Sequence, residues 1–202
     1  MDMRIQNATA ELSQTVADAE ASFGDMTSDQ LNWKPAGKSW SVAQCLDHII
    51  KTNHEFDSEL EKLATGTRVN SFWEQNSPFS GWAGRWLINV VLTDSKKAKA
   101  PTNRIVPPSD IDADIISRFV SEVDEVKRKV AACEGSDADK TVVTSPFLPI
   151  MTYKLSDALT VLVEHTKRHI RQAKRVVEAE GFPRKRATAP ITEKRPVVTD
   201  LV

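Results

Sequence analysis

Two histidines four residues apart, His165 and His169, are the residues whose types and spacing are best suited to chemistry. Residues i and i+4 of a helix lie on one face, with Cβ atoms about 5–6 Å apart, so both imidazoles can reach one metal ion. Zinc helices of the His-Glu-x-x-His type use this spacing, but Thr166 stands here in place of their general base. The pair therefore predicts metal ligation without a metalloprotease mechanism.

The same two histidines lie on the apolar stripe of a predicted helix. Steps of three and four along the chain give the stripe Leu155, Leu159, Leu162, His165, His169, Gln172 and Val176. A buried imidazole without a partner would destabilise the fold, so each ring needs one. A shared metal ion is one interpretation, and ordinary hydrogen bonding of two core histidines is the other.

The remaining histidines, His48 and His54, fall on a second predicted helix. His48 lies beside the apolar seam of this helix, next to Ile49 and one turn beyond Cys45, so it can point into a bundle. His54 is about 240° further round the helix at 3.6 residues per turn, which predicts an exposed side chain.

Composition limits the classes of function. The 202 residues, 40% of them hydrophobic, are enough for one sizeable core and predict one main domain. With 27 basic and 28 acidic residues the formal charge is −1, which argues against nucleic acid or an anionic membrane as partner and favours a small molecule. No signal peptide or spanning segment of about 18 apolar residues is found, and the two cysteines suit buried free thiols. A cytoplasmic location is expected.

Four long amphipathic patterns predict an all-α four-helix bundle. They cover residues 3–23, 41–64, a segment from a Ser109 cap to Gly135, and 155–180. Ser41 and Gln44 form a capping box for the second helix, and no convincing alternating strand is found. We expect residues 1–181 to form the bundle domain and residues 182–202, with three prolines, to form a basic tail.

The connector between the second and third helices, residues 65–110, is unusually long for a bundle. It carries a predicted short helix near 80–93, and a connector of this length usually covers a pocket mouth or a subunit contact, or packs on one face of the bundle. Its apolar content, Trp73, Trp82, Trp86 and the run 86–92, exceeds what one bundle face readily buries. We therefore predict a homodimer.

Several of these residues together resemble the DinB/YfiT-like metalloprotein superfamily of compact four-helix bundles. The matching marks are Trp40-Ser41-Val42, His48 two turns later, the Pro101 to Ser109 approach to the third helix, and His165 to Gln172. The resemblance covers residues 5–180 and implies that His48, His165 and His169 together bind one divalent metal ion. It further implies that some similar proteins are S-transferases that use mycothiol, bacillithiol or related low-molecular-weight thiols, and that such bundles form dimers.

Three imidazoles around one ion leave a coordination position open, which is the pattern of catalytic rather than structural zinc sites. Zinc and nickel both suit nitrogen ligands. A thiol at the open position would give a metal-dependent thiol S-transferase with a small thiol as cosubstrate, and a water there would give a hydrolase. Asn53, Gln172 and, more weakly, Glu164 are candidates for orienting the rings.

A binding protein without catalysis is the competing interpretation. In that case the ion would only tie two helices together, or the bundle would act as a stress-linked partner protein. A purely structural site needs a fourth protein ligand, and Cys45 is the candidate.

Overall fold

The computed structural model describes residues 2–69, 71–76, 80–93, 102–148 and 150–184, and its long elements confirm an all-α bundle. The four long helices of this described part are α1 (Met3–Phe23), α3 (Val42–Ala64), α6 (Ile115–Ala132) and α7 (Leu155–Glu178). Shorter elements are α2 (Ser28–Asn32), α4 (Phe72–Asn76), α5 (Ser80–Leu92), and the 3-10 turns η1 (Asn103–Ile105) and η2 (Cys133–Gly135).

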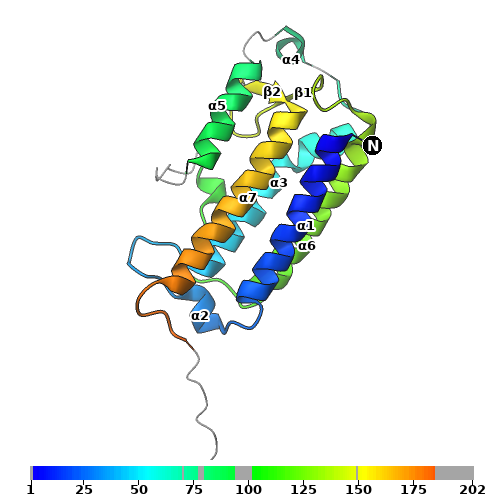
Figure 1. The fold of residues 1–202 in the computed structure, drawn as a ribbon. Coiled ribbons are helices and arrows are strands. Elements are labelled where there is room, and N and C mark those ends of the chain that lie inside the picture. The colour runs from blue at the N-terminus through cyan, green and yellow to red at the C-terminus, as the bar shows by residue number, and fades with distance from the viewer. Residues whose placement is uncertain (1, 70, 77–79, 94–101, 149, 185–202) are drawn as a thin grey trace, which may run out of the picture.

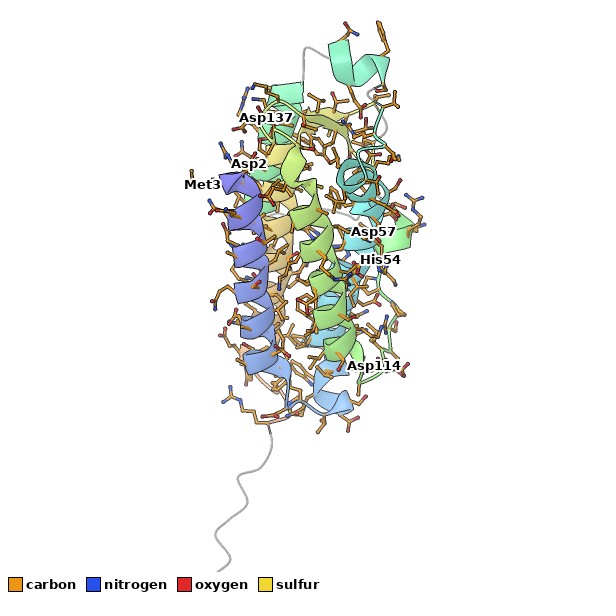
Figure 2. The ribbon with its side chains drawn as sticks, turned by 90° about the vertical axis from the view of Figure 1, so that its right-hand side faces the viewer. Asp2, Met3, His54, Asp57, Asp114 and Asp137 are labelled. Carbon is orange, nitrogen blue, oxygen red and sulfur yellow. The ribbon has the colours of Figure 1, made fainter. Side chains whose placement is uncertain are left out.

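The long helices pack so that α1 and α3 lie at opposite corners. Each of them contacts both α6 and α7 (Figure 1). Helices α3 and α6 run in the same direction, because the connector between them returns the chain from one end of the bundle to the other. Figure 2 shows the same relation from the side, with Met3 and Asp114, which mark the starts of α1 and α6, at opposite ends. A long crossover thus replaces simple up-and-down order.

Helix α3 begins where its sequence signal places it. The amide of Gln44 donates to Ser41 Oγ at 3.2 Å, and the amide of Ser41 donates to Gln44 Oε1 at 3.2 Å. These reciprocal bonds satisfy amides that a helix leaves unpaired at its N-terminus. The apolar seam is buried along its length, with Val42, Leu46 and Ile49 fully inaccessible.

The expected start of the third long helix is wrong by about one and a half turns. Helix α6 begins at Ile115 with Asp114 as its N-cap, and Ser109 does not cap it. The reason lies in a contact across the bundle end, where Ile111 donates its amide to Asn32 Oδ1 at 3.1 Å and accepts from Asn32 Nδ2 at 2.8 Å. These bonds hold the backbone before α6 outside helical geometry.

A small hairpin was not expected from the sequence. Strands β1 (Val142–Thr144) and β2 (Thr152–Lys154) pair antiparallel, with Val143 opposite Tyr153. Three residues per strand are too few to show an alternating pattern, so burial of Val143 and Tyr153 against the bundle sets this structure.

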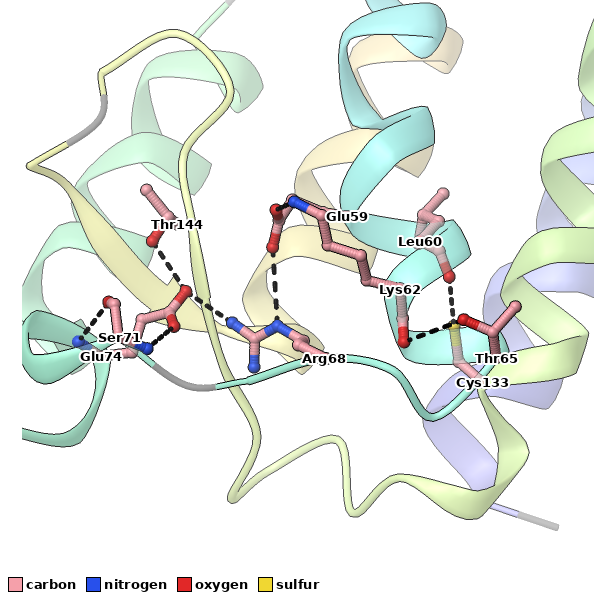
Figure 3. A network of polar contacts seen from close by, with 9 residues as sticks. All are labelled: Glu59, Leu60, Lys62, Thr65, Arg68, Ser71, Glu74, Cys133 and Thr144. Carbon is pink, nitrogen blue, oxygen red and sulfur yellow. Dashed lines mark hydrogen bonds and ion pairs between the residues drawn. The ribbon is translucent and has the colours of Figure 1, made fainter.

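A buried ion pair anchors the start of the connector beside this hairpin (Figure 3). Arg68 Nη2 lies 2.6 Å from Glu74 Oε1, and the two side chains are only 7% and 6% exposed. Glu74 also accepts from Thr144 Oγ1 at 2.8 Å, and Arg68 Nε lies 3.5 Å from Glu59 Oε2. The network joins α3, α4 and β1, and it directs the chain toward α5.

The first residues of the expected tail pack on the bundle. Phe182 makes an edge-to-face contact with Trp33 at 5.5 Å between ring centroids, and Gln30 Nε2 donates to the carbonyl of Pro183 at 2.7 Å. Phe182 and Pro183 therefore contact the bundle, and residues 185–202 lie outside the described residues. No helix in the described ranges is long and apolar enough to cross a membrane.

Candidate metal centre

The fold brings His48, His165 and His169 together between α3 and α7. The ring centroids of His48 and His169 lie 4.5 Å apart, those of His165 and His169 4.5 Å, and those of His48 and His165 5.1 Å. One ligand atom from each ring lies within 4.8 Å of the others. The separations suit three nitrogens that surround a single ion.

Hydrogen bonds fix the orientation of two of these rings. His48 Nδ1 lies 2.7 Å from the carbonyl oxygen of Ile105, and His169 Nδ1 lies 3.0 Å from Gln172 Oε1. Both oxygens can only accept, so each Nδ1 carries the proton and each Nε2 keeps a free lone pair. This is the tautomer that metal-ligating histidines with outer hydrogen-bond partners use.

The third ring, His165, has an unsatisfied nitrogen. Its Nδ1 is buried and has no hydrogen-bond partner among the described residues. A buried polar atom of this kind destabilises a fold unless something completes its bonding. A bound ion, or a ligand held beside it, would do so, and the residues present therefore fit a metal.

All three rings are held neutral. Burial lowers the pKa of His169 to about 3, helped by the nearby His48 and Arg168. Burial is also the main cause that lowers the pKa of His48 and, more strongly, of His165. Neutral imidazoles are the form that binds metals, so protons do not compete for the site near pH 7.

Of the residues expected from the sequence to orient the rings or to supply a fourth ligand, only Gln172 forms a hydrogen bond with a histidine of the cluster in the described structure. Gln172 orients His169, as expected, whereas the Nδ2 of Asn53 has no partner among the described residues and orients no ring. Glu164 bonds to Lys167 at 3.1 Å. Cys45 is absent from the cluster of potential ligands in the described chain, and burial raises the pKa of its thiol to about 12.

Two contacts at the site were missed by reasoning from sequence. The Ile105 carbonyl comes from the connector, and a backbone acceptor leaves no signal in a sequence. The ring of Trp40 lies against those of His48 and His169 in tilted arrangements, at centroid distances of 4.8 Å and 5.7 Å. It was noted only as a mark of resemblance, although a large aromatic residue immediately before a helix cap is a signal that could have been used.

A cavity of about 190 Å³ adjoins the three histidines. Its walls come from α3, α5, α7, η1 and the hairpin loop. Helix α5 is held there by Arg168, whose Nη1 donates to the carbonyls of Val90 and Val91 at 3.2 Å and 3.5 Å. These carbonyls belong to the last turn of α5, where a helix lacks internal donors. The predicted short helix near 80–93 is confirmed, and it covers a pocket.

His54 belongs to a separate polar cluster on the outer face of α3 and α6. Its side chain is 55% exposed, as expected, and its Nε2 lies 2.7 Å from Glu122 Oε2. Figure 2 shows His54 and Asp57 on the same side of α3. Lys129 Nζ lies 2.6 Å from Asp57 Oδ1, so an ammonium group already pairs with one carboxylate of this cluster.

Comparison with known proteins gives one family match and one distant relative. The sequence profile of the DinB superfamily matches residues 11–173. A curated relative, the uncharacterized protein YuaE of Bacillus subtilis (strain 168), is 23% identical over 159 residues, which cover 76% of this chain and 86% of that protein. No solved structure gives a significant match.

Proposed function

Because the chain belongs to the DinB superfamily, we propose that it binds one divalent metal ion, zinc or nickel, through His48, His165 and His169. We further propose that it is a metal-dependent enzyme that transfers a small thiol onto a small-molecule electrophile. The observation that carries the proposal is a cluster of three neutral imidazoles beside a cavity. One ligand atom of each ring lies within 4.8 Å of those of the other two.

The chain's own residues prepare the site before any ligand arrives. Ile105 and Gln172 orient the rings of His48 and His169 through Nδ1, so that these two rings need not reorganise when an ion binds. The ring of Trp40 packs against those of His48 and His169 and supports their positions. Arg168 also lines the cavity, and its guanidinium donates to two backbone carbonyls at the end of α5.

A bound divalent ion would act as a Lewis acid that lowers the pKa of a thiol or a water at the open position. The cavity favours the thiol. Among the described residues that line it there is no carboxylate, and the histidines are assigned to the metal. Either nucleophile would have a lower pKa on a bound ion, but a thiolate then reacts without further help, whereas hydrolysis is usually assisted by an additional general acid or base.

The transfer balances without any oxidant or reductant. The thiol loses its proton to solvent, its sulfur forms a bond to the electrophilic carbon, and the leaving group departs with its bonding electrons. Metal-dependent hydrolysis is the alternative, and a metal-binding bundle without catalysis is the second alternative. The cytoplasmic location expected from the sequence stays a prediction.

The first experiment measures metal in untagged protein by elemental analysis. We expect one ion per chain in the wild type and substoichiometric metal in His165→Ala and His169→Ala. His54→Ala is the matched control, because this histidine lies outside the cluster, and it should keep its metal. Full metal content in His169→Ala would rule out the ligand set.

The second experiment separates the reactions. Metal-loaded protein is incubated with 1-chloro-2,4-dinitrobenzene and a panel of low-molecular-weight thiols, and release of the dinitrophenyl thioether is followed. We expect a rate above that of His165→Ala with at least one thiol. If the rates are equal while esters or amides are cleaved in a metal-dependent way, the hydrolase alternative replaces the transferase.

We also propose a homodimer. Trp82 and Trp86 on α5 are 62% and 46% exposed, and Leu92 at its end is 50% exposed. The side chain of Trp73, which was part of the expectation, lies outside the described residues. Large aromatic side chains left in water are characteristic of interfaces, which supports α5 as the contact between subunits.

A further inference from the structure

Two buried polar atoms, on residues that line the cavity, have no partner in the described part of the chain. They are Thr52 Oγ1 and Asn53 Nδ2, both inaccessible to solvent, in residues that are 5% and 1% exposed. A native fold rarely buries hydrogen-bonding atoms without partners, because each one destabilises it. Since both residues line the cavity, a small rotation of each side chain would bring these atoms to a molecule that enters it, and such a molecule is the expected partner.

Their position relates them to the metal centre. Thr52 follows His48 by one helical turn of α3, so the two side chains lie on one face, about 5–6 Å apart at Cβ. Asn53 is the next residue, and the three histidines line the same cavity. A molecule held by these donors would therefore have its reactive end within reach of the open position.

Most of the remaining wall is apolar. It is formed by Phe56, Leu87, Val90, Phe147, Val161 and Leu162. The rings of Phe56 and Phe147 meet edge to face at 6.0 Å. The volume of about 190 Å³ slightly exceeds the roughly 150 Å³ of an apolar cavity known to bind benzene. The space thus suits one ring with a small substituent.

We propose that the electrophilic substrate is a mainly apolar molecule about the size of one substituted ring, which carries a carbonyl oxygen. Asn53 Nδ2 and Thr52 Oγ1 donate to that oxygen, while the apolar body lies between α5 and α7. This inference rests on the proposed function, because it identifies the cavity as the place of the thiol acceptor. Asn53 and Thr52 are then residues that determine specificity.

The test uses two probes of the same shape. Acetophenone carries C=O where α-methylstyrene carries C=CH₂, so only the first can accept a hydrogen bond. Dissociation constants are measured by NMR titration of the full-length protein, as purified and again after chelation. We expect acetophenone to bind about 3- to 10-fold more tightly than α-methylstyrene, the range of one net hydrogen bond.

Asn53→Leu should reduce this preference, because leucine fills the space of the amide without a donor and leaves only Thr52 Oγ1 to donate. Thr52→Val should reduce it, and this nearly isosteric change tests the inference even if Asn53→Leu does not fold. Asn7→Leu, an exposed position on α1, is the matched control and should keep the wild-type preference. Equal binding of the two probes by the wild type would overturn the inference, as would an unchanged preference in Asn53→Leu.

The two proposals fail separately. The chelated protein reports the hydrogen-bond preference without the ion, so loss of the metal site in the elemental analysis leaves this test intact. Conversely, the two probes could bind equally while elemental analysis still finds one ion per chain. That result would contradict the proposed substrate class but not the proposed metal centre.

Discussion

The Nδ1 of His48 lies 2.7 Å from the carbonyl oxygen of Ile105, a connector residue 57 positions further along the chain. This bond makes the connector part of the candidate site, because it fixes the tautomer and direction of a ring on α3. The same segment carries α5, which closes the adjoining cavity. The long connector therefore orients a candidate metal ligand as well as returning the chain to the other end of the bundle.

Gln172 should control metal affinity through His169. Replacing it with Leu removes the acceptor for His169 Nδ1 and should weaken metal binding about 10- to 100-fold, the usual effect of losing an outer hydrogen bond. Competition with a chromophoric chelator measures the dissociation constant. Gln172→Glu keeps an acceptor and should stay close to the wild type; equal weakening in both variants would show that the hydrogen bond is not the cause.

Removing the metal should leave the bundle folded. The core is formed by apolar side chains of four long helices, which a small zinc domain lacks. After chelation, far-ultraviolet circular dichroism should keep most of its helical signal. Collapse to coil would instead favour a structural role for the ion.

The metal-free protein should lose stability in mild acid. Burial holds the pKa of the three histidines below their ordinary value of 6.5, to about 3 for His169. Below pH 6.5 the unfolded chain therefore binds more protons than the folded chain, so the free energy of unfolding falls as pH falls. Each ring contributes up to about 1.4 kcal/mol per pH unit in this window.

Urea unfolding of the chelated protein between pH 7 and pH 4 measures this dependence. The double variant His165→Gln, His169→Gln lacks two of the three groups that take up these protons and should show a shallower slope. Since other groups titrate equally in both proteins, identical slopes would contradict neutral, buried rings.

Gly84 should be essential for the approach of α5 to α7. A Cβ at this position would lie 2.1 Å from Asp157 Oδ2 and 2.7 Å from Asp157 Cβ, so Gly84→Ala must push the helices apart. We expect a loss of about 1–3 kcal/mol of stability, typical of overpacking, and weaker acetophenone binding as the cavity wall moves. Thermal unfolding and NMR titration measure the two effects.

Gly37→Ala is the control for this change, because a Cβ there meets no atom within 4 Å. It should leave both stability and binding unchanged. Wild-type behaviour of Gly84→Ala would mean that the close approach of the two helices is not needed.

The exposed face of α5 should hold two subunits together. Trp82→Ser combined with Trp86→Ser removes its two largest exposed side chains and should shift the protein from twice the chain mass to the chain mass in sedimentation. Met3→Ser, an exposed apolar position on α1, should leave the mass unchanged. A concentration-independent monomer in the wild type would contradict the dimer.

The sequence by itself determined what depends on neighbouring residues. Helical periodicity and the Ser41 capping box located α1, α3 and α7 closely, because burial of one helix face repeats every three to four residues. The spacing of His165 and His169 places both rings on one face whatever surrounds them. Membership of the DinB superfamily was also recognisable from these local marks.

Only the tertiary structure decided what depends on distant segments. The start of α6 is set by Asn32, the tautomer of His48 by Ile105, and the cavity by α5. None of these contacts has a period or a motif, because each one joins groups that meet only when the chain packs. The unpartnered atoms of Thr52 and Asn53 are the clearest case, since a missing partner can be recognised only when every neighbour is in place.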